Sequence, residues 1–250
     1  MDQSGSAYRF DWGLEGLRHL APVVDVLVIV DVLRFTTAVS VAVDRGATVF
    51  PYAWEGPGAA DFAREHDAIL AGRREDAVWS LSPAGLLHLP PEARLVLPSP
   101  NGSALAVAAR EHGTGHVVAG CLRNATATAR RARALAALGS GVIGVLGAGE
   151  QWGRAGPLRP AVEDLIGAGA ILAALDPSGA VSAPRCSPEA AAARAAFLDA
   201  RSSLEDRLRD SSSGRELLAL GWDDDVEEAA LLDVSGTTAL LVDDAFVAAG

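Results

Sequence analysis

Short apolar runs alternate along the first 175 residues with alanine-rich segments of helical length. Each apolar run is long enough for one strand, and a few small or polar residues separate it from the helical segment that follows. Strands that are apolar on both faces belong in a parallel sheet, because crossover helices cover both sides of it. The pattern predicts an α/β protein, a three-layer α/β/α fold with a mostly parallel sheet. The five pairs are Val23–Asp31 with Thr36–Arg45, Ala47–Tyr52 with Gly58–Ala71, Arg94–Pro98 with Gly102–His112, His116–Gly120 with Asn124–Leu138, and Gly141–Leu146 with Pro160–Leu175.

The remainder of the chain has a different pattern. Residues 176–188 are rich in Ser, Pro and Gly, which favours a linker. Ser187 then caps a helix, and we expect residues 189–250 to form a mainly helical C-terminal portion with an edge strand at Thr238–Val242. We expect residues 1–175 to form the α/β core with the active-site edge, and the C-terminal portion to pack on it. Two lobes that face each other across a cleft are the alternative.

Charge and composition exclude several functions. The net charge is −11, but residues 221–250 carry eight carboxylates and no Arg, which leaves about −3 for the rest. A nearly neutral body without a basic face argues against nucleic-acid binding. All 21 basic residues are Arg, and the absence of Lys excludes Schiff-base chemistry and the Walker A motif. The apolar runs are too short to span a membrane and no secretory leader precedes them, so we expect a cytoplasmic protein without a membrane partner.

Polar residues gather just after the predicted strands. In open α/β sheets ligands bind beyond the carboxyl ends of the strands, where loops meet the N-termini of helices. We therefore expect a site at this edge of the sheet. The candidate residues are Asp31, Arg34, Asn101, Gly102, Ser103, Arg123, Asn124, Glu163 and Asp164.

The first candidates each allow two interpretations. Asp31 either hydrogen-bonds a nearby turn, or binds a metal or reacts. Arg34 either binds an anion through both ends of its guanidinium or pairs with Asp31. The segment Asn101-Gly102-Ser103 suits an oxyanion held by backbone N–H groups and a hydroxyl, or an ordinary turn and helix cap.

The later candidates are equally open. Glu163 and Asp164 are adjacent on a predicted helix and cannot share one face, so at most one points straight at a metal while the other orients a water or a neighbouring group. Alternatively, both are first-turn acids favoured by the helix dipole. Arg123 either binds a second acid group of a substrate or is a solvated residue at a helix start.

Taken in order, several segments resemble the 2-phosphosulfolactate phosphatase family over roughly residues 25–175. The tail from Ser213-Gly214 to Leu218, with Gly221 and Asp225 beyond it, is also similar. The matching core segments are Val30-Asp31-Val32-Leu33-Arg34-Phe35-Thr36-Thr37 with Gly46-Ala47, Ser99-Pro100-Asn101-Gly102-Ser103, Arg123-Asn124-Ala125, Gly147-Ala148-Gly149, and Val162-Glu163-Asp164 to Ala168-Gly169.

The resemblance implies a magnesium-dependent phosphatase of coenzyme M biosynthesis, a phosphoric monoester hydrolase that converts 2-phosphosulfolactate to sulfolactate and phosphate. It implies a homodimer whose substrate is a small phosphorylated anion. In this interpretation three carboxylates are catalytic and hold Mg²⁺, and the other candidates bind the substrate. The carboxylates are Asp31, Glu163 and Asp164, and the substrate-binding residues are Arg34, Asn101, Gly102, Ser103, Arg123 and Asn124.

Residues 72–83 depart from the family pattern. The chain has Gly72-Arg73-Arg74 where the family has Gly-Glu-Arg, and only Ser82-Pro83 remains of the loop that follows. The glutamate, aspartate and asparagine of that loop are missing. The alternative function is therefore a catalytically silent relative that binds an anionic metabolite or a partner protein.

Overall fold

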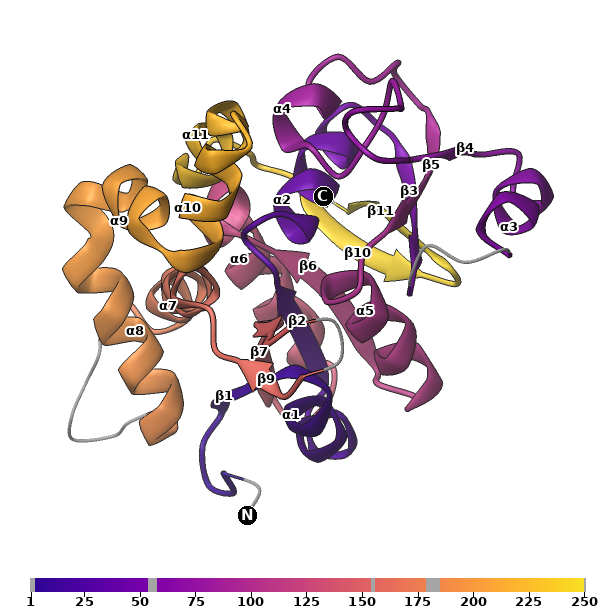
Figure 1. Ribbon diagram of the computed structural model, residues 1–250. Helices are drawn as coiled ribbons and strands as arrows, with labels where there is room; N and C mark the ends of the chain where they lie inside the picture. Colours follow the sequence, from indigo (N-terminus) through magenta and orange to yellow (C-terminus); the bar gives the residue numbers. More distant parts are fainter. Residues whose placement is uncertain (1–2, 54–57, 154–155, 179–184, 250) are drawn as a thin grey trace.

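The computed structural model describes residues 3–53, 58–153, 156–178 and 185–249. Within them, nine strands form one sheet in the order β1-β7-β2-β6-β10-β11-β3-β5-β4, and β8 pairs with β9 in a small second sheet (Figure 1). The strands are β1 Tyr8–Trp12, β2 Val26–Val30, β3 Thr48–Tyr52, β4 Ile69–Leu70, β5 Arg94–Pro98, β6 His116–Gly120, β7 Ile143–Gly147, β8 Glu150–Gln151, β9 Leu158–Arg159, β10 Thr238–Val242 and β11 Ala245–Ala249.

Helices cover the sheet, and the predicted α/β fold with a mostly parallel sheet is confirmed. The segment Gly58–Ala71, which we expected to be one helix, contains the short helix α3 and the edge strand β4. The α-helices are α1 Gly13–Leu20, α2 Phe35–Asp44, α3 Ala59–Glu65, α4 Pro83–Leu86, α5 Gly102–Glu111, α6 Ala125–Ala136, α7 Val162–Leu175, α8 Pro188–Ala200, α9 Leu204–Asp210, α10 Ser212–Ala219 and α11 Asp223–Ala230.

The sheet consists of two parallel groups joined by an antiparallel hairpin. Strands β1, β7, β2 and β6 are parallel to one another, and so are β3, β5 and β4. The hairpin β10–β11 lies between the groups, with Leu240 opposite Val118 of β6 and Phe246 opposite Val49 of β3 (Figure 1). Because each of these pairings is antiparallel, the two parallel groups run in opposite directions.

Strand β10 is therefore an interior strand, and the expected edge strand at Thr238–Val242 is wrong. It bonds to β6 on one side and to β11 on the other. The physical reason is that the last strands of the chain fill the gap between the two parallel groups, and both of their edges find a partner there. Sequence pattern alone shows no sign of which strands lie beside a given strand.

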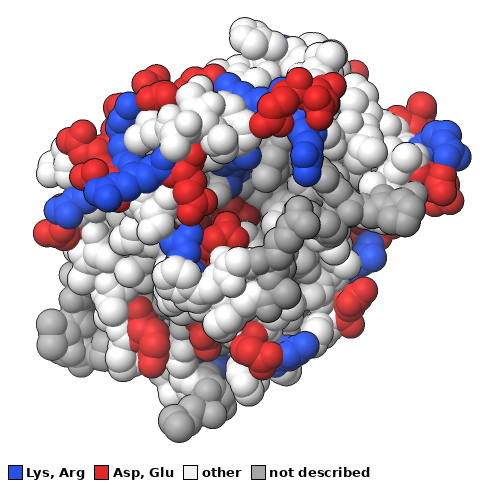
Figure 2. Space-filling view, in the orientation of Figure 1, with Lys and Arg blue, Asp and Glu red and all other residues white. Residues whose placement is uncertain are grey.

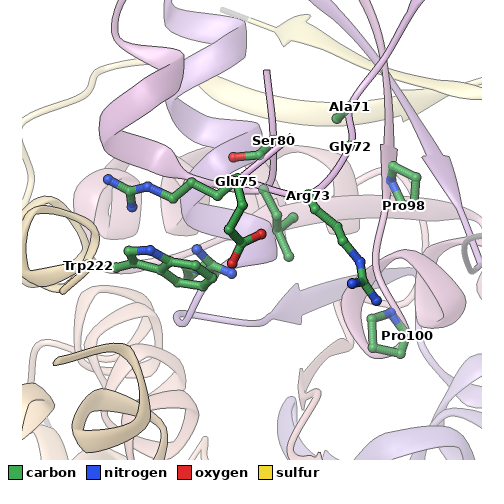
Figure 3. A pocket seen from close by; sticks show the side chains of 11 residues that line it. Ala71, Gly72, Arg73, Glu75, Ser80, Pro98, Pro100 and Trp222 are labelled. Carbon is green, nitrogen blue, oxygen red and sulfur yellow. The ribbon is translucent and has the colours of Figure 1, made fainter. Parts of the chain in front are cut away.

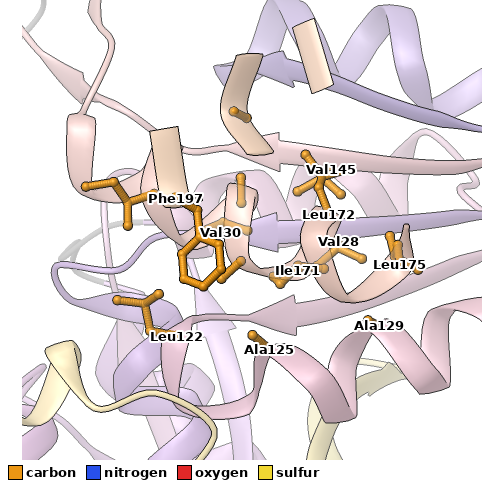
Figure 4. Close-up of a cluster of buried hydrophobic side chains, with 14 of the residues drawn as sticks. Val28, Val30, Leu122, Ala125, Ala129, Val145, Ile171, Leu172, Leu175 and Phe197 are labelled. Atoms are coloured by element: carbon orange, nitrogen blue, oxygen red, sulfur yellow. The ribbon is translucent and has the colours of Figure 1, made fainter. Parts of the chain in front are cut away.

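Strand β2 shows how the core is divided. Val26, Val28 and Val30 face a cluster that also contains apolar residues of α6, α7 and α8 (Figure 4). Leu27 and Ile29 point to the other face and pack with residues of α1, α2 and α5. The alternation places helices on both faces of the sheet, as the doubly apolar strands predict.

The C-terminal residues return to the core in two ways. Helix α8 packs against α7 so closely that a Cβ on Gly169 would lie 2.1 Å from the backbone oxygen of Ala193, and helices α9 to α11 follow it. The hairpin β10–β11 then enters the sheet. Part of the linker expected at 176–188 lies outside the described residues. In the described part of the chain, no helix is long and apolar enough to cross a membrane.

Candidate active site

Asp31 lies directly after β2, and two backbone N–H groups hold its carboxylate. The N–H of Phe35 donates to Oδ1 at 3.1 Å, and the N–H of Gly102 donates to Oδ2 at 2.9 Å. Both donors belong to the first residues of helices, α2 and α5, where N–H groups have no partner within the helix. The expected bond between Asp31 and its own turn is thus present, together with a second bond from a distant helix.

Burial and the negative charges of Glu150 and Glu163 together raise the pKa of Asp31 to about 6, although the two N–H bonds oppose the shift. The side chain is almost completely buried. A carboxylate in such a place is costly to ionise unless a cation lies close by.

Asp164 lies in the first turn of α7 and has a similar environment. Its carboxylate accepts the N–H of Val32 at 2.7 Å and the N–H of Gly149 at 2.9 Å. It thereby ties the loops that follow β2 and β7 to one helix. Burial raises the pKa of Asp164 well above its usual value, and the charges of Asp31 and Glu163 add to the shift.

Glu163 is also buried, and its Oε2 atom has no hydrogen-bond partner among the residues that the structure describes. Its charge raises the pKa of both Asp31 and Asp164, so the structure brings the three acids close together. Of these two neighbours, Asp164 accepts hydrogen bonds from two backbone N–H groups, whereas Oε2 of Glu163 accepts none from the described residues. The two side chains have the different environments that neighbouring positions on a helix predict.

The donor set can be tested against a magnesium ion. Within the described ranges, no three His, Cys, Asp or Glu side chains are placed so that they hold a metal ion together. Mg²⁺ commonly uses only one or two carboxylates, with waters and substrate oxygens as its remaining ligands. Asp31 and Asp164 have raised pKa values, and the buried Glu163 has an Oε2 atom without a partner among the described residues, so a cation among these acids would supply the positive charge that they lack. The residues therefore fit Mg²⁺ bound through one or two carboxylates.

Arg34 does not pair with Asp31, which was one of its two interpretations. Its Nη1 donates to Oδ2 of Asp225 at 2.7 Å, 191 residues further along the chain, and not to Asp31. Asp225 is fully buried and also accepts from Nη1 of Arg74 at 2.7 Å and from Oγ of Ser82 at 2.5 Å. Helix α11 thus holds two arginines of the site in place.

Trp222 completes this group just before α11. The guanidinium carbons of Arg34 and Arg74 lie 4.7 Å and 5.5 Å from the centre of its ring. Such cation–π contacts stabilise a guanidinium and restrict its direction. The segment of Trp222 and Asp225 near the C-terminus therefore contributes directly to the site.

Two cavities open where the carboxyl ends of the two parallel groups meet. The first has a volume of about 280 Å³, and Figure 3 shows its lining, with Arg73 extending toward Pro100. The second has a volume of about 1000 Å³ and shares Arg73 and Pro100 with the first. In Figure 2 a hollow lies beside C-terminal helices that carry acidic and basic side chains in a mixed pattern. Charged and polar lining residues are Arg34, Arg73, Arg74, Glu75 and Ser80 in the first cavity, and Arg73, Asn101, Glu150, Gln151, Arg159, Ser212 and Glu216 in the second.

Asn101 and Glu150 connect the larger cavity with the buried acids. The Asn101 amide donates to Oε1 of Glu150 at 3.0 Å, and both residues line the cavity. Glu150 in turn raises the pKa of Asp31.

Several predicted substrate ligands have protein partners instead. The Gly102 N–H donates to the Asp31 carboxylate, and the Ser103 hydroxyl donates to the carbonyl of Leu97 at 2.7 Å. Asn124 is fully buried and accepts the N–H of Cys121 at 3.0 Å. In the structure these groups hold loops in position, which corresponds to the turn-and-cap interpretation of residues 101–103.

Arg123 also forms ion pairs within the protein. It pairs with Glu228 of α11 and, at 3.3 Å, with Asp44 at the end of α2, and it is 6% exposed. It is therefore not the solvated residue of the alternative interpretation. A substrate anion would have to compete with these two carboxylates for Arg123.

Sequence reasoning gave no role in the site to five residues that the structure brings there: Glu150, Arg73, Arg74, Trp222 and Asp225. Glu150 follows β7 as Asp31 follows β2, so its position after a strand was an available signal. For the other four, the alternation of strands and helices carries no information, because they reach the site from loops and from a helix outside that pattern.

Comparison with known proteins identifies the family of this chain. The family model described as 2-phosphosulpholactate phosphatase matches residues 15–244. In class the chain is thus a phosphoric monoester hydrolase. It is 30% identical over 215 residues to the 2-phosphosulfolactate phosphatase of Methanothermobacter thermautotrophicus, an alignment that covers 84% of this chain and 83% of the relative. The chain belongs to the 2-phosphosulfolactate phosphatase family.

Proposed function

We propose that this chain is a magnesium-dependent phosphatase that hydrolyses 2-phosphosulfolactate to sulfolactate and phosphate. The observation that carries the proposal is the group of buried acids, Asp31, Glu163 and Asp164, beside cavities lined with arginine. Family membership and the name of the archaeal relative support the substrate.

Hydrolysis of a phosphate monoester requires the enzyme to neutralise the phosphoryl oxygens and to place a water in line with the bond that breaks. Asp31 with Glu163 or Asp164 would hold Mg²⁺, which supplies positive charge to the phosphoryl group. Arg34, fixed by Asp225 and Trp222, presents a guanidinium on the wall of the smaller cavity. Asn101 and Glu150 lie on the wall of the larger cavity, where they can orient a water.

The backbone contacts to the acids have a second role in this proposal. The N–H groups of Phe35 and Gly102 fix the orientation of Asp31, and those of Val32 and Gly149 fix Asp164. Carboxylates that are already oriented lose little conformational entropy when they bind a cation.

The silent relative remains the competing hypothesis. Two observations favour it: residues 72–83 lack the acids of the family loop, and in the described part of the chain no three side chains form a complete metal site. A silent relative would bind the anion without turnover, so an assay of phosphate release separates the two functions.

The test is the release of phosphate from 2-phosphosulfolactate, phospholactate and phosphoglycolate by the purified protein, with Mg²⁺ and with a chelator. We expect release with Mg²⁺ and the largest kcat/KM for 2-phosphosulfolactate. Asp31→Asn should abolish turnover, and circular dichroism should show an intact fold. If the protein releases phosphate from none of the three compounds, the enzymatic proposal is wrong, and calorimetric binding of the same compounds would then support the silent relative.

A further inference from the structure

We propose that Arg73 determines substrate specificity by binding the acid group of the substrate that lies beyond the phosphate ester and the carboxylate. In 2-phosphosulfolactate this group is the sulfonate. The inference rests on the proposed function, and it concerns a residue where this chain departs from the Gly-Glu-Arg pattern of its family.

The charges around the smaller cavity lead to Arg73. Arg34 is neutralised by Asp225, and Arg74 by Asp224 and Asp225. Among the residues that the structure describes, Arg73 forms no ion pair with a carboxylate. A dianionic or trianionic substrate therefore finds in Arg73 a guanidinium that is free of a competing acid.

The position of Arg73 suits this role. It is exposed and lines both cavities, and in Figure 3 its side chain extends along the wall toward Pro100, the residue before Asn101. Asn101 leads through Glu150 to the buried acids, so a substrate with its phosphate near these acids has its far end directed into the shared part of the cavities. A planar guanidinium binds carboxylate or sulfonate oxygens through two parallel hydrogen bonds.

Glu75 provides an internal control. It lines the smaller cavity two residues after Arg73, and Figure 3 shows its carboxylate directed toward the region of Trp222. Its charge repels an anion that enters this cavity. Removal of the Arg73 charge and removal of the Glu75 charge should therefore change the binding of an anionic substrate in opposite directions.

The experiment measures KM and kcat of Arg73→Gln, Arg73→Lys and Glu75→Gln for 2-phosphosulfolactate and for phospholactate, which lacks the sulfonate. We expect Arg73→Gln to raise the KM for 2-phosphosulfolactate about tenfold, because the charge-assisted contact with the sulfonate is lost, with the change in KM rather than in kcat. For phospholactate the KM should change less than about threefold. Arg73→Lys should restore part of the affinity, and Glu75→Gln should lower the KM.

An equal rise in KM for both substrates, or no rise for either, would overturn the role of Arg73. If the unmodified protein releases no phosphate, calorimetry with sulfolactate and lactate tests Arg73 independently of turnover. Tighter binding of sulfolactate that disappears in Arg73→Gln supports the inference even though the proposed function then fails. Equal binding of the two compounds, or binding of neither, would overturn it.

Discussion

The backbone N–H of Gly102 donates a 2.9 Å hydrogen bond to Oδ2 of Asp31. Gly102 begins α5, after the end of β5, and Asp31 follows β2, so the bond joins the two parallel groups of the sheet. The groups run in opposite directions, yet their carboxyl ends meet at this contact. The two cavities open in the same region, where residues from both groups line them.

This contact requires a glycine at position 102. An added Cβ would lie 2.3 Å from Cδ1 of Phe35 and 2.7 Å from Oδ2 of Asp31, and both side chains are buried. We expect Gly102→Ala to lower the free energy of unfolding by about 1–3 kcal/mol and to reduce phosphate release strongly. Urea unfolding and the phosphatase assay measure the two effects. Gly236→Ala is the control, because in the described part of the chain nothing beyond its two neighbours lies within 4 Å of its added Cβ. Equal losses of stability and activity in the two variants would contradict the steric argument.

The raised pKa of Asp31 predicts a pH dependence of stability. The unfolded carboxyl ionises near 3.8, whereas the folded one keeps its proton up to about 6. The folded state therefore binds more protons in this window, and the contribution of Asp31 to stability falls as the pH rises through it, by about 1–3 kcal/mol in total. The free energy of unfolding of Asp31→Asn, compared with that of the unmodified protein, should therefore increase as the pH rises from 4 to 6. Urea unfolding at several pH values checks this; curves that stay parallel would mean that the carboxyl is not perturbed.

Magnesium binding should depend on the same proton. Because Asp31 must lose its proton before it binds a cation, the Kd for Mg²⁺ should rise about tenfold for each pH unit that the pH lies below about 6, and should be constant above it. Isothermal titration calorimetry at pH 5 to 8 provides the measurement. Glu163→Gln, which removes the acid with the orphaned Oε2, should weaken binding at every pH. Affinity that does not vary with pH would remove Asp31 from the set of ligands.

Asp225 and Asp224 offer a matched pair of substitutions. Asp225 is fully buried and accepts hydrogen bonds from Arg34, Arg74 and Ser82, whereas about half of the Asp224 side chain is exposed and pairs with Arg74. We expect Asp225→Asn to cost about 3–5 kcal/mol, because it leaves the largely buried guanidinium of Arg34 without a counter-charge and removes one of the two acids that pair with Arg74, and to raise the KM. Asp224→Asn should cost about 0–1 kcal/mol. Thermal or urea unfolding measures both, and a similar cost in the two variants would exclude Asp225 as the residue that positions the arginines.

The strands that local pattern predicted well are those with strong, continuous apolar character. Arg94–Pro98 and His116–Gly120 were predicted with the bounds that β5 and β6 have. Burial on both faces requires an apolar strand, so such strands can be recognised from the sequence without any tertiary information. Strand β4 has only two residues and β1 has alternating polar positions, and neither produces such a run.

The arrangement of the site depended on contacts far apart in the chain. Asp31 is a candidate from the sequence because it follows a buried strand, but its bond to Gly102 spans 71 residues. Pairing with Asp31 was one of the two interpretations of Arg34, and Arg34 pairs instead with Asp225. Both partners are acids, and local pattern cannot rank a near acid against a distant one that the fold buries.

By itself, the sequence determined that alternating strands and helices build an α/β protein, and that polar residues collect after the strands, because periodicity and burial act over a few neighbouring residues. The tertiary structure decided that β10 and β11 enter the middle of the sheet, which sets the directions of the two parallel groups. It also decided which guanidinium groups the protein's own acids neutralise, and that Arg73 pairs with none of the acids in the described part of the chain. Hydrogen bonding between strands and pairing of buried charges depend on distance in space, which the order of residues along the chain does not contain.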